Sequence, residues 1–138
     1  MSTLYNILAF VLMTNLLSPV PGLKPHELRT CYVNCDLEGK LDFQIFAYAM
    51  ESLEEMEYSN ESIVTIIDFS KPSTEKRLFI LDLEKQKILY HTYVAHGKNT
   101  GQNMATKFSN TKGSNQSSLA LSGTAESYQG MHGYFMRR

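Results

Sequence analysis

The residues of this chain whose side chains could take part in catalysis or binding are concentrated in one polar stretch, residues 93–118. It reads YVAHGKNTGQNMATKFSNTKGSNQSS. The stretch holds three glycines, four asparagines and a His-Gly step at His96 and Gly97. Glycine at the end of a strand lets the backbone approach a ligand closely, and long irregular loops in compact domains are often functional. The alternative is a solvated connection with no chemical role. The residues alone leave both interpretations open.

Metal and phosphate chemistry find little support in this stretch. His91 and His96 are five positions apart, so on one continuous strand their side chains would point to opposite faces. His132 lies far along the chain, and no carboxylate cluster accompanies the three histidines. The Gly-Lys-Ser/Thr run of a phosphate-binding loop is absent from the sequence. We expect neither a metal site nor a cofactor.

A nucleophile is equally hard to identify. No Gly-x-Ser-x-Gly elbow is present, and the serines lie among Asn, Ser and Gly residues that turn chemistry explains. The only cysteines, Cys31 and Cys35, are four positions apart. They could remain inert thiols, form a small-loop disulfide, pair with another chain or, on a helix, share a face as half of a metal site. Inert thiols or a disulfide are favoured, because the sequence has no second Cys or His pair with ligand spacing.

One amphipathic helix is predicted upstream of the polar stretch, over residues 41–57, LDFQIFAYAMESLEEME. Phe43, Phe46, Met50 and Leu53 recur at helical spacing, and the glutamates fall mostly on the opposite side. A stripe of Met and Phe residues is typical of a helix that faces a core. We therefore expect this helix to pack rather than to bind a cofactor.

The strands that would carry the polar stretch follow from β-branched and alternating patterns. Residues 62–69, SIVTIIDF, indicate a strand buried on both faces or nearly so. Residues 77–83 and 87–95 indicate a β-hairpin that is closed by the polar turn EKQ, with Asp82 exposed to water.

The second strand of this hairpin alternates, which places Leu89 and His91 on one face and Ile88 and Tyr90 on the other. Further short strands are expected at residues 117–123 and at the end of the chain. Helices do not alternate with strands, so a parallel crossover sheet is disfavoured. The sequence predicts a mainly β fold with an N-terminal helix, either an antiparallel β-sandwich or a curled sheet with the helix packed outside.

The first 22 residues differ from the rest of the chain. They are mostly apolar and uncharged from Leu4 to Leu17, and Pro19, Pro21 and Gly22 end the run. This length suits a secretory signal peptide, although no Lys or Arg precedes the apolar core. A membrane anchor and a buried N-terminal helix are the alternatives. We expect residues 1–22 to direct export and residues 23–40 to form a linker.

Composition narrows the class of protein further. The 138 residues suffice for one domain, and a hydrophobic content of 43% is that of a globular protein. The net charge is −1, from 13 basic and 14 acidic residues, which gives no reason to expect nucleic acid as a partner.

Five short segments have a familiar order and spacing: DFSKPSTEKR (68–77), VAHGKN (94–99), KFSN (107–110), GSNQSS (113–118) and HGY (132–134). Over residues 41–138 the chain resembles the N-terminal part of the catalytic domain of the murein L,D-transpeptidases (YkuD-like). The resemblance implies a β-sandwich-like domain in the periplasm or cell envelope of a bacterium, with the stem peptides of peptidoglycan as partners.

The resemblance also implies a reaction. Enzymes of this family use a cysteine in a Ser/Thr-x-Gly-Cys motif, which attacks the stem-peptide carbonyl, and a histidine as general base. The motif lies downstream in the family, and Arg138 is reached before it. We therefore carry over no catalytic residue and expect a truncated, inactive domain. The alternatives are a non-enzymatic peptidoglycan-binding protein of the envelope and a fragment of a longer gene.

Eight residues match family positions and are candidates for the substrate side of the groove, although each could equally be structural: His96, Gly97, Lys98, Ser109, Asn110, Ser114, Gln116 and His132.

Overall fold

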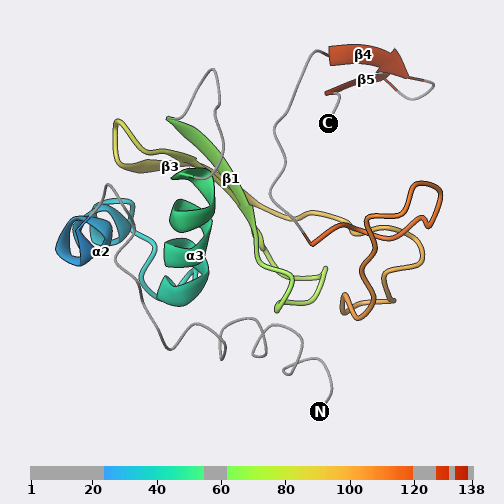
Figure 1. Ribbon diagram of the computed structural model, residues 1–138, viewed down its shortest axis with the longest axis horizontal. Helices are drawn as coiled ribbons and strands as arrows, with labels where there is room; N and C mark the ends of the chain where they lie inside the picture. The colour runs from blue at the N-terminus through green and yellow to red at the C-terminus, as the bar shows by residue number, and fades with distance from the viewer. Residues whose placement is uncertain (1–23, 55–61, 120–126, 131–132, 137–138) are drawn as a thin grey trace.

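The computed structural model describes residues 24–54, 62–119, 127–130 and 133–136 (Figure 1). In chain order the elements are α2 (Pro25–Asn34), α3 (Phe43–Glu54), β1 (Ile63–Ile67), β2 (Leu78–Asp82), β3 (Lys87–Thr92), β4 (Ser127–Gly130) and β5 (Gly133–Met136). The N-terminal residues 1–22, and with them the predicted export signal, lie outside the described residues. Within the described part of the chain, no helix has the length and apolarity needed to cross a membrane.

The strands β1, β2 and β3 form an antiparallel sheet in that order. Val64 pairs with Leu81, and Phe79 pairs with His91. The predicted hairpin of β2 and β3 is confirmed, as is a mainly β class with helices. The strands β4 and β5 pair only with each other among the described residues. A closed sandwich therefore remains a prediction.

The helix α2 lies inside the segment that the sequence analysis interpreted as a linker. It begins with Pro25, whose fixed φ suits a first helical position, and the backbone N–H of Lys24 donates to the Glu27 carboxylate at 2.9 Å. Leu28 and Tyr32, one turn apart, are buried. The pattern was missed because charged and polar residues separate these few apolar positions.

The helix α3 falls within the predicted range of 41–57, and its core-facing role is confirmed. Asp42 precedes it and accepts a hydrogen bond from the backbone N–H of Gln44 at 2.7 Å, which satisfies one of the free donors of the first turn. Phe46 and Met50, one turn apart, are buried.

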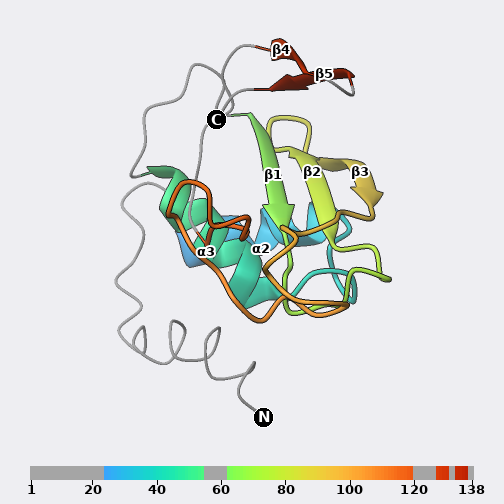
Figure 2. The same cartoon turned by 90° about the vertical axis from the view of Figure 1, so that its right-hand side faces the viewer.

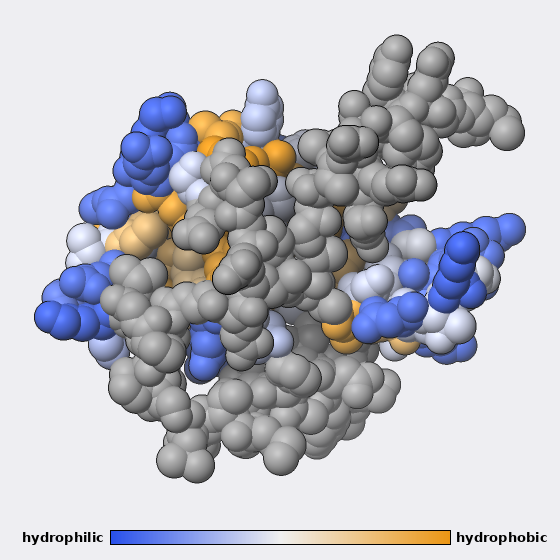
Figure 3. Space-filling view, turned by 45° about the horizontal axis from the view of Figure 1, so that its top comes forward, coloured by the Kyte–Doolittle hydropathy of each residue, from blue (hydrophilic) through white to orange (hydrophobic). Residues whose placement is uncertain are grey.

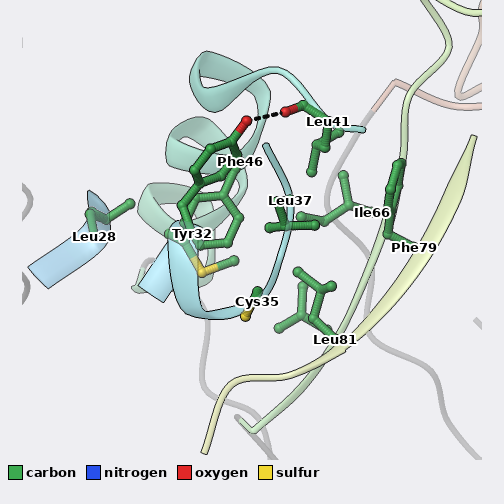
Figure 4. Packing of buried hydrophobic residues seen from close by; sticks show 11 residues of the cluster. Leu28, Tyr32, Cys35, Leu37, Leu41, Phe46, Ile66, Phe79 and Leu81 are labelled. Carbon is green, nitrogen blue, oxygen red and sulfur yellow. Dashed lines mark hydrogen bonds between the residues drawn. The ribbon is translucent and has the colours of Figure 1, made fainter. Parts of the chain in front are cut away.

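Both helices cover the same face of the three-stranded sheet (Figure 2). The core lies between the two helices and the sheet (Figure 4). It combines Leu37 and Phe46 with the sheet residues Phe79 and Leu81, and none of the four exposes any surface. The Tyr32 hydroxyl donates to the Leu41 carbonyl inside this cluster, so the polar end of the ring is satisfied where it is buried.

Two strand predictions need correction. In β1 only Val64 and Ile66 are buried, whereas Ile63 is 41% exposed, so the strand is covered on one face rather than two. In β3 the register shifts opposite Ile80 and Leu81, so Ile88 lies on the same face as His91 instead of the face of Tyr90, and it packs against the core. This bulge breaks the simple alternation on which the prediction for β3 depended.

The strand predicted at residues 117–123 is also wrong in its described part. Residues 117–119 have no strand conformation, and residues 120–123 lie outside the described residues. Strand β4 instead begins at Ser127, after the end of the segment predicted to be a strand, and β5 matches the expected final strand.

Asp82 was predicted to be exposed to water, but it is buried at the end of β2. Its carboxylate accepts the backbone N–H of Lys85 at 2.8 Å and pairs with the Lys85 ammonium at 3.2 Å. The backbone hydrogen bond is the main cause that lowers the pKa of Asp82. The carboxylate is thus buried by the β2–β3 turn, whose backbone it holds.

The lowered pKa of Asp82 predicts a pH-dependent stability. A depressed carboxyl pKa adds stability that is fully present above the unfolded-state value, about 3.9, and is lost as the pH falls through the folded-state value. Asp82→Asn is therefore expected to lower the melting temperature at pH 7 and to match the parent chain in strong acid. The neighbouring exposed Glu84→Gln serves as the control, and equal melting temperatures of Asp82→Asn and parent at pH 7 would contradict the assignment.

Candidate functional site

The polar stretch after β3 has no helix or strand up to residue 119, yet one buried residue joins its start, middle and end. The carbonyl of Thr100 accepts the backbone N–H groups of Thr106 and Lys107, both at 2.9 Å. The hydroxyl oxygen of Thr100 accepts the N–H of Ser117 at 2.7 Å. Thr100 is completely buried, so these bonds form away from water. We call residues 96–117 the Thr100 loop.

Gly97 permits the closest approach within this loop. Its N–H donates to the Ser117 hydroxyl at 2.9 Å, and a Cβ atom at this position would lie 2.6 Å from the Asn115 carbonyl oxygen. The N–H of Asn99 donates to that same carbonyl at 2.9 Å. The position of Gly97 at a strand end predicted that it would let the backbone approach a ligand. In the structure it lets the backbone approach another part of the same loop.

The Thr100 loop is attached to the sheet by the guanidinium of Arg77, which is completely buried. One terminal nitrogen donates to the Lys71 carbonyl at 2.9 Å, and the other donates to the Val94 carbonyl at 2.9 Å and to Nδ1 of His96 at 2.8 Å. The Nε–H donates a further bond to Val94 at 3.2 Å. One side chain therefore links residues 68–77 to the beginning of the loop.

The surroundings of Arg77 explain how a cation is held there. Burial lowers the pKa of Arg77, and the carboxylate of Asp68 acts in the opposite direction. Asp68 is itself buried and accepts the N–H of Ser70 at 3.0 Å as well as the Ser70 hydroxyl. The guanidinium carbon also lies 5.1 Å from the centre of the Phe69 ring, in cation–π range.

The contact with Arg77 fixes the tautomer of His96. A guanidinium can only donate, so Nδ1 of His96 must accept and its proton must be on Nε2. The Nε2–H then donates to the Gly101 carbonyl at 3.2 Å. Both ring nitrogens are thus engaged, and no lone pair remains to remove a proton from a substrate. In this arrangement His96 is a structural residue.

A second group of contacts joins the same two segments. The N–H of Ser73 donates to the Asn103 carbonyl at 2.8 Å, and the Ser73 hydroxyl donates to the Asn103 side-chain oxygen at 3.1 Å. The rings of Phe69 and Phe108 pack with their centres 5.5 Å apart. Four of the five segments that carry the family resemblance are therefore brought together.

Two candidate serines shape turns within the loop. The Ser109 hydroxyl accepts the N–H of Thr111 at 3.1 Å, and the Ser114 hydroxyl accepts the N–H of Gln116 at 3.3 Å. The Ser114 carbonyl accepts the side-chain amide of Asn99 at 2.9 Å. These serines support the backbone and are not positioned as nucleophiles.

The remaining candidates differ in exposure. Lys98 and Asn110 are exposed, and Gln116 is partly buried. His132 lies outside the described residues, so its role remains a prediction. Lys98, Asn110 and Gln116 are therefore the candidate side chains left to meet a ligand.

The two cysteines belong to the core at the end of α2, which lies on the opposite side of the molecule from the Thr100 loop (Figure 1). Cys31 is in α2 and Cys35 directly follows it, with their sulfur atoms 4.0 Å apart. Burial raises the pKa of the Cys31 thiol, and burial together with Cys31 raises the pKa of Cys35 to about 12. Such thiols are poor nucleophiles at neutral pH. No group of three or more His, Cys, Asp or Glu side chains suited to a metal is found in the described part of the chain.

Sequence reasoning missed the two residues that organise the site. Arg77, Phe79 and Leu81 alternate, so the arginine occupies a position on the same face as two core residues, and this spacing was a usable sign of burial. Thr100 has no comparable sign, because its bonds join positions up to 17 residues apart.

A model of the L,D-transpeptidase catalytic domain matches residues 37–137. Because the match spans most of the chain, the chain belongs to the L,D-transpeptidase catalytic-domain family, as its resemblance indicated. Comparison with curated proteins and comparison with solved structures each gave no match.

Replacing Thr100 with valine keeps its shape and removes the hydroxyl. The buried N–H of Ser117 would lose its acceptor, so we expect the free energy of unfolding to fall by about 1–3 kcal/mol. Urea denaturation measures this change, and amide exchange at Ser117 should become faster. Thr92→Val, at an exposed position, is the matched control. Equal stability of the two variants would show that the hydroxyl does not hold the loop.

Arg77→Lys tests the attachment of the loop. A lysine ammonium cannot reproduce the planar fork that reaches Lys71, Val94 and His96, so we expect a loss on the order of 3 kcal/mol. Long-range ¹H–¹⁵N NMR should show a single Nε2–H tautomer for His96 in the parent chain and a mixture in the variant.

Arg29→Lys is the control for this substitution, because its guanidinium is largely exposed and should lose less than about 1 kcal/mol. An unchanged His96 spectrum in the Arg77 variant would refute the tautomer assignment.

Proposed function

We propose that this chain is a cell-envelope protein that binds the stem peptides of peptidoglycan through the exposed side of the Thr100 loop. The observation that carries the proposal is the family match over residues 37–137, which includes the whole of that loop. The bonds from Arg77 and Thr100 support it, since a loop held by buried hydrogen bonds loses little entropy when it binds a ligand.

Export is part of the proposal. Peptidoglycan lies outside the cytoplasmic membrane, and the uncharged apolar run from Leu4 to Leu17 has the length of the core of a secretory signal. Signal cleavage and membrane anchoring by this segment would both deliver residues 37–137 to the polymer.

In the chemistry of the family, a cysteine thiolate attacks the carbonyl carbon of a diamino acid residue and expels the following amino acid as an amine. The resulting thioester is then cleaved by the amine of an acceptor peptide. Among the 138 residues the only thiols are Cys31 and Cys35, whose raised pKa values keep both protonated. We therefore propose that a polypeptide of these residues binds stem peptides without forming the thioester.

Binding is tested by retention on purified sacculi. We expect the purified chain to sediment with intact sacculi and to remain in solution when an amidase has first removed the stem peptides. Retention on the peptide-free glycan as strong as on intact sacculi would redirect the proposal to the sugar strands, and absence of retention on both would refute it.

Acyl transfer is tested with a carbapenem, which acylates an activated thiolate. Intact-mass spectrometry should show no adduct on the parent chain, while an active L,D-transpeptidase treated in parallel gains the mass of the drug. An adduct that disappears in Cys31→Ser or Cys35→Ser would overturn the proposed lack of thioester chemistry.

A further inference from the structure

The near-zero net charge of the chain conceals a strong separation of charge along it. Residues 24–84 carry thirteen acidic and six basic side chains, a net charge of −7. Residues 85–125 carry five lysines and no acidic residue, a net charge of +5. The Thr100 loop lies within this second segment and contains three of the lysines, Lys98, Lys107 and Lys112.

These three lysines are exposed to solvent on the Thr100 loop. None of them takes part in the four ion pairs found in the described part of the chain. Those ion pairs all lie between Arg29 and Lys85, where the acidic residues are. In Figure 3 the lobe that the loop forms, at the right of the view, is mostly hydrophilic.

The backbone beneath the lysines is fixed, although their ammonium groups form no ion pair with a described residue. Lys98 lies between Gly97 and Asn99, whose N–H groups both bond within the loop. The N–H of Lys107 donates to the Thr100 carbonyl at 2.9 Å. Lys112 lies in a turn in which the N–H of Ser114 donates to the Thr111 carbonyl. The loop therefore presents its positive charges from a defined frame.

We propose that Lys98, Lys107 and Lys112 form a carboxylate-binding surface that recognises the anionic groups of the stem peptide. This inference rests on the proposed function and names the part of the ligand that the loop would meet. A stem peptide offers a free C-terminal carboxylate and the unamidated carboxylates of its acidic residues, and an unpaired ammonium attracts each of them.

The composition of the surface favours carboxylates over phosphates. Between residues 78 and 136 the chain has no arginine, the residue that proteins prefer for planar, two-point recognition of phosphate. The lysines alternate instead with amide side chains such as Asn110 and Gln116, which suit a peptide backbone. A nucleic acid is thus the less suitable anion.

The experiment measures binding of an N-acetylated stem peptide by NMR titration of the full chain. The peptide with free carboxylates should bind, and the same peptide with every carboxylate amidated should bind at least about tenfold more weakly. Affinity for the anionic form should fall as the salt concentration rises from about 20 to about 500 mM, because salt screens exposed charges.

Three variants, Lys98→Gln, Lys107→Gln and Lys112→Gln, locate the effect. Each should weaken binding of the anionic peptide by about two- to fivefold, as expected for one exposed charge pair, and the triple variant by more. Lys87→Gln removes the same charge at the far end of β3 and should leave the affinity unchanged. The comparison of the two peptides on the parent chain needs no variant and holds even if a variant folds poorly.

Two outcomes would overturn the inference. One is equal affinity for the free and amidated peptides on a chain that still binds sacculi, which would leave the proposed function intact. The other is binding of duplex DNA as tight as that of the anionic peptide, which would make the surface a general polyanion site. Absence of sacculus binding together with salt-sensitive binding of the free peptide would instead leave this inference standing and refute the proposed binding to the assembled polymer.

Discussion

The buried guanidinium of Arg77 is the interaction on which the arrangement of this molecule depends. It donates to two carbonyl groups and one imidazole, which come from segments on either side of the β2–β3 hairpin. A buried cation is tolerated only when its donors are matched and an opposite charge is near, and Asp68 supplies that charge. The acceptors are two main-chain carbonyl groups and a ring that is itself hydrogen-bonded. Arg77 therefore fixes the position of the start of the Thr100 loop relative to the sheet.

The loop divides its residues between two tasks. His96 and Thr100 form hydrogen bonds within the protein, and Gly97 lies in close contact with the backbone of the same loop. The side chains of the three lysines and of Asn110 are exposed to solvent. Sequence motifs of a family therefore mix residues that build a surface with residues that use it, and only the hydrogen bonds distinguish the two groups.

The elements that the sequence predicted well are those with a regular period. The helix α3 and the hairpin follow from apolar spacing that needs no knowledge of the rest of the fold. The helix α2 was not predicted because its buried face holds few apolar residues. Asp82 was wrongly predicted to be exposed, because the hydrogen bond from the backbone of the following turn to its carboxylate leaves no pattern in the sequence. The bulge in β3 depends on the pairing register of β2 and β3, which cannot be predicted from the sequence of either strand alone. The candidate site was located along the chain, but the inward role of His96 required its contact with Arg77.

The bulge opposite Ile80 and Leu81 also has a consequence for how the length of the chain can vary. It lets Ile88 and His91, three positions apart, both face the helices, and His91 stacks on Phe79 with ring centres 4.3 Å apart. Leu89 is the extra residue of the bulge, so deleting it would restore regular alternation and leave Ile88 and His91 on the same face. Inserting or deleting one residue after His91 would instead reverse the facing of the side chains that follow. Strand β3 thus tolerates a change of length at its bulge alone, whereas the exposed tip around Gly113 can lengthen or shorten with little harm.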